Sequence, residues 1–199
     1  MNNLVEQDQN RLKLLKKYGY DIPKIRNRIL AKAGLSFDGN MLEVGTGRGH
    51  MAVALARKGF KFVSIDLDKN GQEVAKTYLK MVKGGKSVNF KIMNAEKLRY
   101  KDGSFDYVIS VDFIHHAKHP VKCLKEMIRV AKNMLVVADI NKRGARIMEK
   151  VHRLNGHSHA PSKISLKGME VLLKKSGMKV KVYRDAYHNI IIAKKGVTK

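Results

Sequence analysis

The stretch MLEVGTGRGHM, residues 41–51, places three glycines at alternate positions directly after a short apolar run. Glycine admits positive φ and lets a ligand approach the backbone closely, and a helix that follows offers free N–H groups. Glu43 lies two residues before the first glycine, and a negative side chain there suits a cation better than a pyrophosphate. These residue types indicate a binding loop for a positively charged ligand.

A second acid, Asp66, ends the next apolar run. A carboxylate at the end of the second strand is where nucleotide-binding folds accept hydrogen bonds from ribose hydroxyls. The glycine spacing is G-x-G-x-G and differs from the G-x-G-x-x-G of dinucleotide sites. The loop, the strand-end acid and the local negative charge together indicate a positively charged nucleoside, and S-adenosylmethionine is such a molecule.

Alternating strand and helix patterns position these groups. Strands are predicted over residues 41–44, 60–65, 88–93, 105–111 and 133–138, and helices over 48–58, 70–81 and 120–131. Such β-α units predict a parallel sheet with helices on both faces. Two helices are predicted before them, over residues 4–17 and 23–33. After them we expect helices over 143–154 and from Ser165 to about Gly177, and then a hairpin of strands 179–183 and 189–193.

Four segments in order resemble a known family. LEVGTGRGHMAVALARKG resembles the first motif of class I S-adenosylmethionine-dependent methyltransferases of the small, type 11-like kind, and FVSIDLDKN resembles their acidic motif. NAEKLRYKDGSFDYVIS and DFIHHAKHPVKCLKEMIRVAKN resemble the adenine-binding stretch and the region after the fourth strand. The resemblance covers residues 31–139. Relatives often have a Pro-Gly-Gly turn before the fifth strand, and its absence here predicts a tighter connection.

The resemblance implies an α/β fold, a doubly wound, Rossmann-like, mostly parallel seven-stranded sheet with a C-terminal β-hairpin and N-terminal helices. We expect one methyltransferase domain over residues 1–199. Its parts are a helical cap at 1–34, a cofactor-binding core at 35–140, and C-terminal helices with the hairpin at 141–199. The implied cofactor is S-adenosyl-L-methionine.

The resemblance also implies which residues bind that cofactor. Glu43 supports its amino end, Asp66 binds the ribose, Leu67 flanks the adenine, and Asn94 stands where many relatives have Asp. The full implied set is Glu43, Gly45, Thr46, Gly47, Gly49, Asp66, Leu67, Asn94, Ala95, Ser110 and Val111.

Methyl transfer from a sulfonium is an in-line displacement, which needs alignment and, for some acceptors, a general base. Asp112, His115 and His116 follow the fourth strand on the acceptor side and are the candidate catalytic residues; the alternative is that these histidines only pack in the loop. Cys123, inside an apolar helix stripe, is expected in the core. We predict no metal site, and it stays open whether His152, His157 and His159 bind a metal or line the acceptor pocket.

The net charge of the chain indicates which kinds of molecule it could bind. Lys plus Arg is 41 and Asp plus Glu is 17, a net charge of +24 that attracts polyanions or serves solubility. The first residues do not resemble a secretory signal, no apolar run is long enough to span a membrane, and there is one cysteine, so we expect a cytoplasmic protein. The expected acceptor is a small molecule. The alternatives are an RNA methyltransferase that uses its basic surface and a catalytically silent RNA-binding or partner subunit. The sequence does not indicate the oligomeric state.

Overall fold

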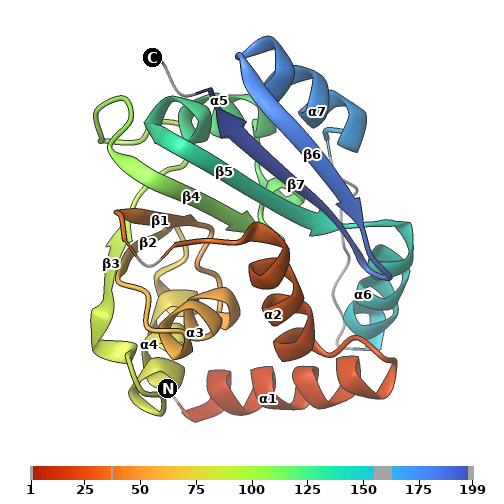
Figure 1. Cartoon of the computed structure of the whole chain (residues 1–199). Coiled ribbons are helices and arrows are strands. Elements are labelled where there is room, and N and C mark those ends of the chain that lie inside the picture. The colour runs from red at the N-terminus through yellow and green to blue at the C-terminus, as the bar shows by residue number, and fades with distance from the viewer. Residues whose placement is uncertain (1, 37, 155–162, 197–199) are drawn as a thin grey trace.

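The structure, a computed structural model, describes residues 2–36, 38–154 and 163–196. A seven-stranded sheet forms its centre, in the order β3-β2-β1-β4-β5-β7-β6 (Figure 1). The strands are β1 (Met41–Val44), β2 (Phe62–Asp66), β3 (Val88–Ile92), β4 (Phe105–Val111), β5 (Ala131–Ile140), β6 (Met178–Arg184) and β7 (His188–Lys195). The first five pair in parallel, and β7 is antiparallel to both β5 and β6. The predicted fold and its terminal hairpin are confirmed.

Helices cover both faces of the sheet, which is why β1 is buried along its whole length. The helices are α1 (Asn2–Lys17), α2 (Ile22–Ala33), α3 (His50–Arg57), α4 (Lys69–Lys80), α5 (Pro120–Val130), α6 (Lys142–Leu154) and α7 (Leu166–Lys175). Buried side chains of α2, α3 and α6 form one apolar cluster with one face of the sheet, and those of α5 and α7 form a second cluster with the other face.

Local sequence explains where α2 begins and ends. The Asp21 side chain accepts a hydrogen bond from the backbone N–H of Lys24 at 3.1 Å and caps the helix, and Pro23 fits the first turn because no hydrogen bond needs its missing N–H. Gly34 then adopts a φ of 58° and ends the helix in the left-handed conformation. These signals set the first and last turns of α2.

Two connections differ in detail from the sequence expectation. The helix expected from Arg48 begins at His50, because Gly49 has a φ of 81° and stands outside the helix as its N-cap. The strand expected from Asn133 begins at Ala131, directly after the last residue of α5. The expected tight connection is thus a helix that passes into a strand with no residue between them.

Within the described residues, no helix is long and apolar enough to cross a membrane. The helix α1 lies across the molecule beside α2 and α6, so the beginning of the chain closes against a late element (Figure 1). This arrangement covers the region where the parallel strands end.

Candidate functional site

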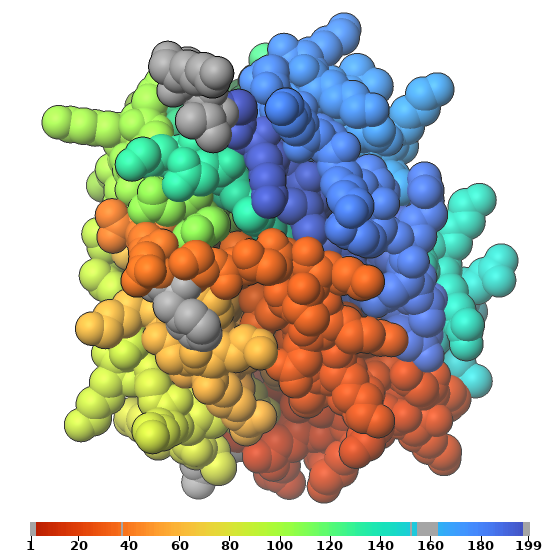
Figure 2. All heavy atoms as spheres, viewed as in Figure 1, coloured from red at the N-terminus to blue at the C-terminus, as the bar shows by residue number. Residues whose placement is uncertain are grey.

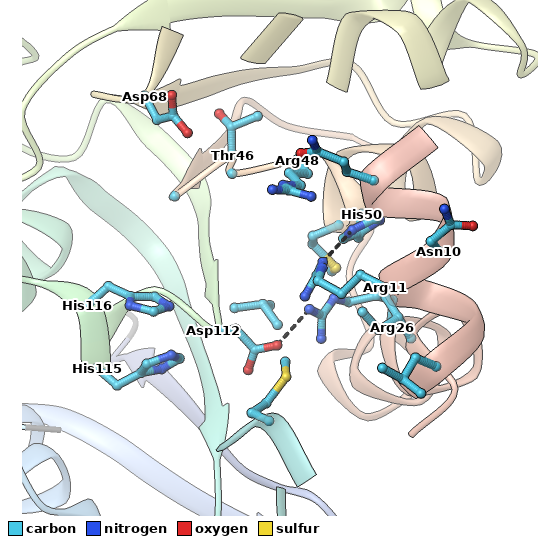
Figure 3. Close-up of a pocket in the computed structure, with 18 residues that line it drawn as sticks. Asn10, Arg11, Arg26, Thr46, Arg48, His50, Asp68, Asp112, His115 and His116 are labelled. Atoms are coloured by element: carbon cyan, nitrogen blue, oxygen red, sulfur yellow. Dashed lines mark hydrogen bonds and ion pairs between the residues drawn. The ribbon is translucent and has the colours of Figure 1, made fainter. Parts of the chain in front are cut away.

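A cavity of about 910 Å³ lies at the carboxyl ends of the central strands. Its walls come from α1, α2, the glycine loop, the residues after β4, and Met148 of α6. In Figure 3 the arginines lie on one side of it, His115 and His116 lie on the opposite side, and Asp112 stands between them. The volume falls in the range of pockets that enclose small ligands.

The glycine loop forms one wall, and three of its five residues carry no side chain. A Cβ on Gly45 would stand 2.6 Å from the Cβ of Phe113, and one on Gly49 would stand 2.4 Å from the Cβ of Ala75. Gly47, by contrast, has a φ of 48° and nothing within 4 Å of the place of a Cβ. Gly45 and Gly49 therefore allow close packing, whereas Gly47 leaves room in front of the loop.

The strand-end acid Asp66 holds this loop in shape. Its Oδ2 accepts a hydrogen bond from the Gly47 N–H at 2.7 Å, and its Oδ1 accepts one from the Asp68 N–H at 2.9 Å. Asp68, and not Asp66, is among the residues that line the cavity. A hydroxyl donor that approaches this edge therefore meets two neighbouring carboxylates.

Glu43 is buried beneath the loop and does not line the cavity. Its Oε2 accepts a hydrogen bond from Ser64 Oγ at 2.5 Å, and Ser64 Oγ is 2.6 Å from Thr46 Oγ1. Burial raises the pKa of Glu43 to about 8, against the hydrogen bond from Ser64 and the charge of Arg26, which lower it. The acid thus acts on the loop through Ser64 and Thr46.

His115 is buried against Asp139, the last acid of β5. Its Nδ1 is hydrogen-bonded to Asp139 Oδ1, and its backbone N–H donates to Asp139 Oδ2 at 3.1 Å. A carboxylate only accepts, so Nδ1 carries the proton and Nε2 is the basic nitrogen. Burial lowers the pKa of His115, but Asp139 raises that pKa more, so the net shift is upward. Both His115 and the exposed His116 line the cavity.

Asp112 forms a second aspartate–histidine pair, with an arginine added. Its Oδ1 is 2.8 Å from His188 Nε2, and its Oδ2 is 2.7 Å from Arg26 Nη2. Burial by itself raises the pKa of Asp112, but Arg26 and His188 outweigh it and hold that pKa well below its usual range. Asp112 also has a φ of 53°, a left-handed conformation that Asp tolerates better than most residues. Its carboxylate is fully engaged and poorly suited to accept a further proton.

Arg26 is the cation of this wall. Its side chain is 6% exposed, and its Nε and Nη1 have no hydrogen-bond partner within the described chain, although Arg26 lines the cavity. Buried N–H groups without a partner are costly, so they favour an anionic ligand beside them. His188 is fully buried, and its Nε2 lies 3.2 Å from the hydroxyl of Tyr20, which is equally buried.

A further aspartate, the buried Asp8, attaches α1 to the site. Its Oδ1 accepts from Arg11 at 3.0 Å and from Arg48 at 3.2 Å, and its Oδ2 accepts from Tyr78 Oη at 2.9 Å. His50 Nε2 is 3.2 Å from the same carboxylate. Asp8 therefore joins α1 to the start of α3 and to α4, over the glycine loop.

Of the other predicted cofactor residues, Val111 lines the cavity, whereas Leu67, Asn94, Ala95 and Ser110 do not. Leu67 is 64% exposed, Asn94 Oδ1 accepts from the Glu96 N–H at 2.9 Å, and Ala95 is buried in the second apolar cluster. Ser110 Oγ donates to the Val44 carbonyl at 3.0 Å, under the floor that Val111 provides.

Two further expectations concern cysteine and histidines. Cys123 is buried among apolar residues, which confirms its expected place in the core, and burial raises its pKa to about 11. His157 and His159 lie outside the described residues, as does the side chain of His152. Among the described residues there is no group of three or more acids, histidines or cysteines that fits a metal ion.

Sequence reasoning overlooked Asp139, Arg26, His188 and Asp8. Asp139 carried a signal, since it ends a predicted strand at the same sheet edge as Asp66 and Asp112. The other three carried none, because a single charged residue on a helix or a histidine in a hairpin usually stands in solvent.

Comparison with known proteins agrees with this geometry. Residues 42–136 match the family model described as a methyltransferase domain. Ajmaline N-methyltransferase of Rauvolfia serpentina is 30% identical over 152 residues, which are 72% of this chain and 46% of that protein. Ribosomal RNA small subunit methyltransferase A of Caldanaerobacter subterraneus subsp. tengcongensis is 31% identical over 98 residues, 48% of this chain and 37% of that protein. The chain spans less than half the length of these curated relatives.

Solved structures show the same fold at lower identity. Magnesium protoporphyrin IX methyltransferase from Synechocystis PCC 6803, solved with bound S-adenosylmethionine, superposes with a TM-score of 0.65 at 16% identity. The superposition covers 98% of this chain and 85% of that chain. The likeness therefore extends well beyond residues 42–136.

Proposed function

Because the chain carries a methyltransferase domain and has the class I methyltransferase fold, we propose that it transfers a methyl group from S-adenosylmethionine to a small-molecule acceptor. One observation carries the proposal. One cavity has a glycine-rich loop on one wall and the His115–Asp139 pair on another. The first wall suits a nucleoside cofactor, and the second supplies a base.

The residues of the cavity fit that cofactor. The Gly45–Gly47 backbone and the carboxylates of Asp66 and Asp68 offer partners for its amino-acid and ribose portions, and the unpartnered N–H groups of Arg26 suit its carboxylate. Bound there, the cofactor supplies a sulfonium-activated methyl group for in-line displacement. Leu67, Asn94 and Ala95 remain our proposal for the adenine end.

His115 is the proposed general base. With Nδ1–H held by Asp139, Nε2 removes the proton that an acceptor oxygen or nitrogen loses as it is methylated. Asp139 orients the imidazole and stabilises its charged form. We assign Asp112 a positioning role in place of the predicted catalytic one, because Arg26 and His188 already occupy both of its oxygens. His116 stays a candidate contact for the acceptor.

The position of α1 along the cavity favours a small acceptor. Gln7, Asn10, Arg11 and Leu14 of α1 line it from the side opposite the sheet, and Asp8 fastens that helix down. The name of the plant relative also denotes a small-molecule acceptor. A nucleotide of RNA is the second candidate acceptor, favoured by the net charge of +24 and by the ribosomal RNA methyltransferase among the relatives.

Calorimetric titration of S-adenosylmethionine and S-adenosylhomocysteine tests the cofactor. We expect binding in about the micromolar range and at least about a tenfold loss in Asp66→Ala, since a charged hydrogen-bond partner of loop and ligand disappears. Asp38→Ala, an exposed acid outside the cavity lining, is the matched control and should bind as the wild type does. No binding by the wild-type protein would refute the proposal.

The acceptor class is tested separately with a labelled methyl group. Transfer is followed to a panel of small amines, phenols and carboxylic acids, and in parallel to total RNA. Label in small molecules that depends on His115 supports the proposal. Label in RNA alone would replace the small molecule with the second candidate.

A further inference from the structure

A basic surface lies outside the cavity, on the sheet face that α2 only partly covers. Lys179 and Lys181 of β6 are two residues apart and therefore point to the same face, about 7 Å from each other. Lys194 of β7 is the register partner of Lys179. Lys32, near the end of α2, approaches the same face, as its contact with Tyr183 shows. We call these four exposed lysines the hairpin lysines.

Figure 2 shows this side of the molecule, with α2 in orange-red beside the blue strands of the hairpin. Two interactions join the elements there. The Lys32 ammonium lies 5.3 Å from the centre of the Tyr183 ring, and Arg28 of α2 is 3.7 Å from a carboxylate oxygen of Asp185, just after β6. The surface is thus continuous from the helix to the edge strand.

The hairpin lysines lack the carboxylate partners that some other cations at the surface have. Lys76, Lys174 and Arg129 each form an ion pair with a nearby carboxylate at 2.7 Å. Within residues 2–36, 38–154 and 163–196, none of the four hairpin lysines forms such a pair. Their charge is therefore available to a partner.

Two of the hairpin lysines face each other across the strand pair, an arrangement that does not stabilise the sheet. Lys179 and Lys194 stand directly opposite each other on antiparallel strands, and like charges in that position destabilise the pair. Lys181 lies 5.0 Å from the centre of the Tyr183 ring, so one aromatic ring takes a cation from the strand and another from α2. Both ammonium groups therefore lie beside the same ring.

We propose that the hairpin lysines and Tyr183 form a docking surface for a single-stranded polynucleotide, which they hold by its phosphates. Unpaired lysines around an aromatic side chain suit such strands, whose backbone is anionic and whose bases stack. An anionic membrane is the weaker fit. The exposed large apolar side chains of the described chain are Leu4, Leu67, Met81, Ile92, Val121, Leu154 and Val171, and α2, β6 and β7 contribute none of them.

The surface is separate from the methyl-transfer site. None of the four hairpin lysines lines the cavity. The inference stands without the proposed reaction. A binding measurement without cofactor tests it, so its failure would not bear on methyl transfer.

The test is fluorescence anisotropy of the full chain with labelled oligouridine RNA and oligothymidine DNA of about twelve nucleotides, within the site sizes of single-strand binders. The variant is Lys179→Gln/Lys181→Gln/Lys194→Gln. We expect at least about a tenfold rise in Kd at low salt. The slope of log K against log salt should fall by about two, because each lost phosphate contact removes roughly 0.7.

A charge-matched control removes three exposed lysines from α5 and α7 on the other face of the sheet, as Lys125→Gln/Lys167→Gln/Lys175→Gln. It should bind within about twofold of the wild type, since net charge alone acts weakly at a distance in salt. Tighter binding of the RNA than of the DNA would identify RNA as the partner, and equal affinity would indicate that the surface binds both kinds of strand. Equal weakening in the two variants would overturn the proposal. So would the absence of strand binding by the wild type, with or without binding to vesicles of phosphatidylglycerol.

Discussion

Two aspartate–histidine pairs stand at the ends of neighbouring strands, and they differ in their third partner. Asp139 of β5 holds His115, which faces the cavity. Asp112, after β4, contacts His188, which is fully buried, and it also pairs with Arg26 of α2. In the first pair the carboxylate serves one imidazole. In the second it neutralises an arginine, and the imidazole has no face toward the cavity.

The comparison shows that an aspartate–histidine pair differs in role according to whether the histidine faces the cavity and whether a cation shares the aspartate. A histidine at the cavity wall with an orienting carboxylate can exchange protons with a ligand. A carboxylate shared between an arginine and a buried histidine fixes three elements relative to one another. Residue identity alone therefore does not distinguish a base from a structural anchor.

The sharpest way to break the comparison is to remove each imidazole. In His115→Asn we expect kcat to fall by about 10²–10⁴-fold, because general base catalysis is lost, while the affinity for S-adenosylhomocysteine stays near the wild-type value and the melting temperature falls less than in His188→Asn. His188→Asn should show the opposite pattern, with a clear loss of stability. Comparable kcat in His115→Asn and wild type would end the base assignment.

The second test removes the charge of Asp112. Asp112→Asn keeps the shape and tolerates the left-handed backbone, but it leaves Arg26 buried and uncompensated, so we expect a loss of about 3–5 kcal/mol in unfolding free energy. Denaturant titration measures it. The double variant Arg26→Met/Asp112→Asn removes both charges and should recover part of the loss; additive losses would show that the two residues are not coupled.

The smallest effect is a shift in pH dependence. A base must be neutral, and Asp139 raises the pKa of His115 above its ordinary value, so kcat should rise with pH through that raised pKa. Asp139→Asn should move the rise to lower pH by about one to three units, because the neighbouring charge is gone. A pH–rate profile that Asp139→Asn does not shift would contradict the coupling.

Stability has a related pH dependence with a definite sign. The pKa of His115 in the folded protein exceeds its value of about 6.5 in the unfolded chain. The His115–Asp139 pair therefore stabilises the fold fully below about pH 6.5, and this stabilisation is lost as the pH rises through the folded pKa. The difference in stability between wild type and Asp139→Asn should therefore be larger at about pH 6 than at about pH 9.

Most of the fold could be predicted from the sequence, because its signals are local. Apolar runs that end in glycine or an acid mark β1, β2 and β4, and Pro23 and Gly34 bracket α2. The helix start at His50 was missed by two residues, since the left-handed backbone at Gly49 depends on its contact with Ala75 of α4.

The site was less predictable, because its partners meet only in three dimensions. Arg26 and Asp112 are 86 positions apart, and Tyr20 and His188 are 168 apart. Tyr20, just after α1, packs against Tyr187 from the far end of the chain, with ring centres 5.2 Å apart. No periodicity in the chain encodes such pairings.

The contact between Tyr20 and His188 also sets a condition on folding during synthesis. A ribosome releases α1 and α2 first, yet α1 packs on α6, and the buried partner of Tyr20 is near the end of the sheet. These contacts can therefore form only after α6 and β7 have been made. The buried position of Tyr20 is thus complete only when translation has passed residue 188.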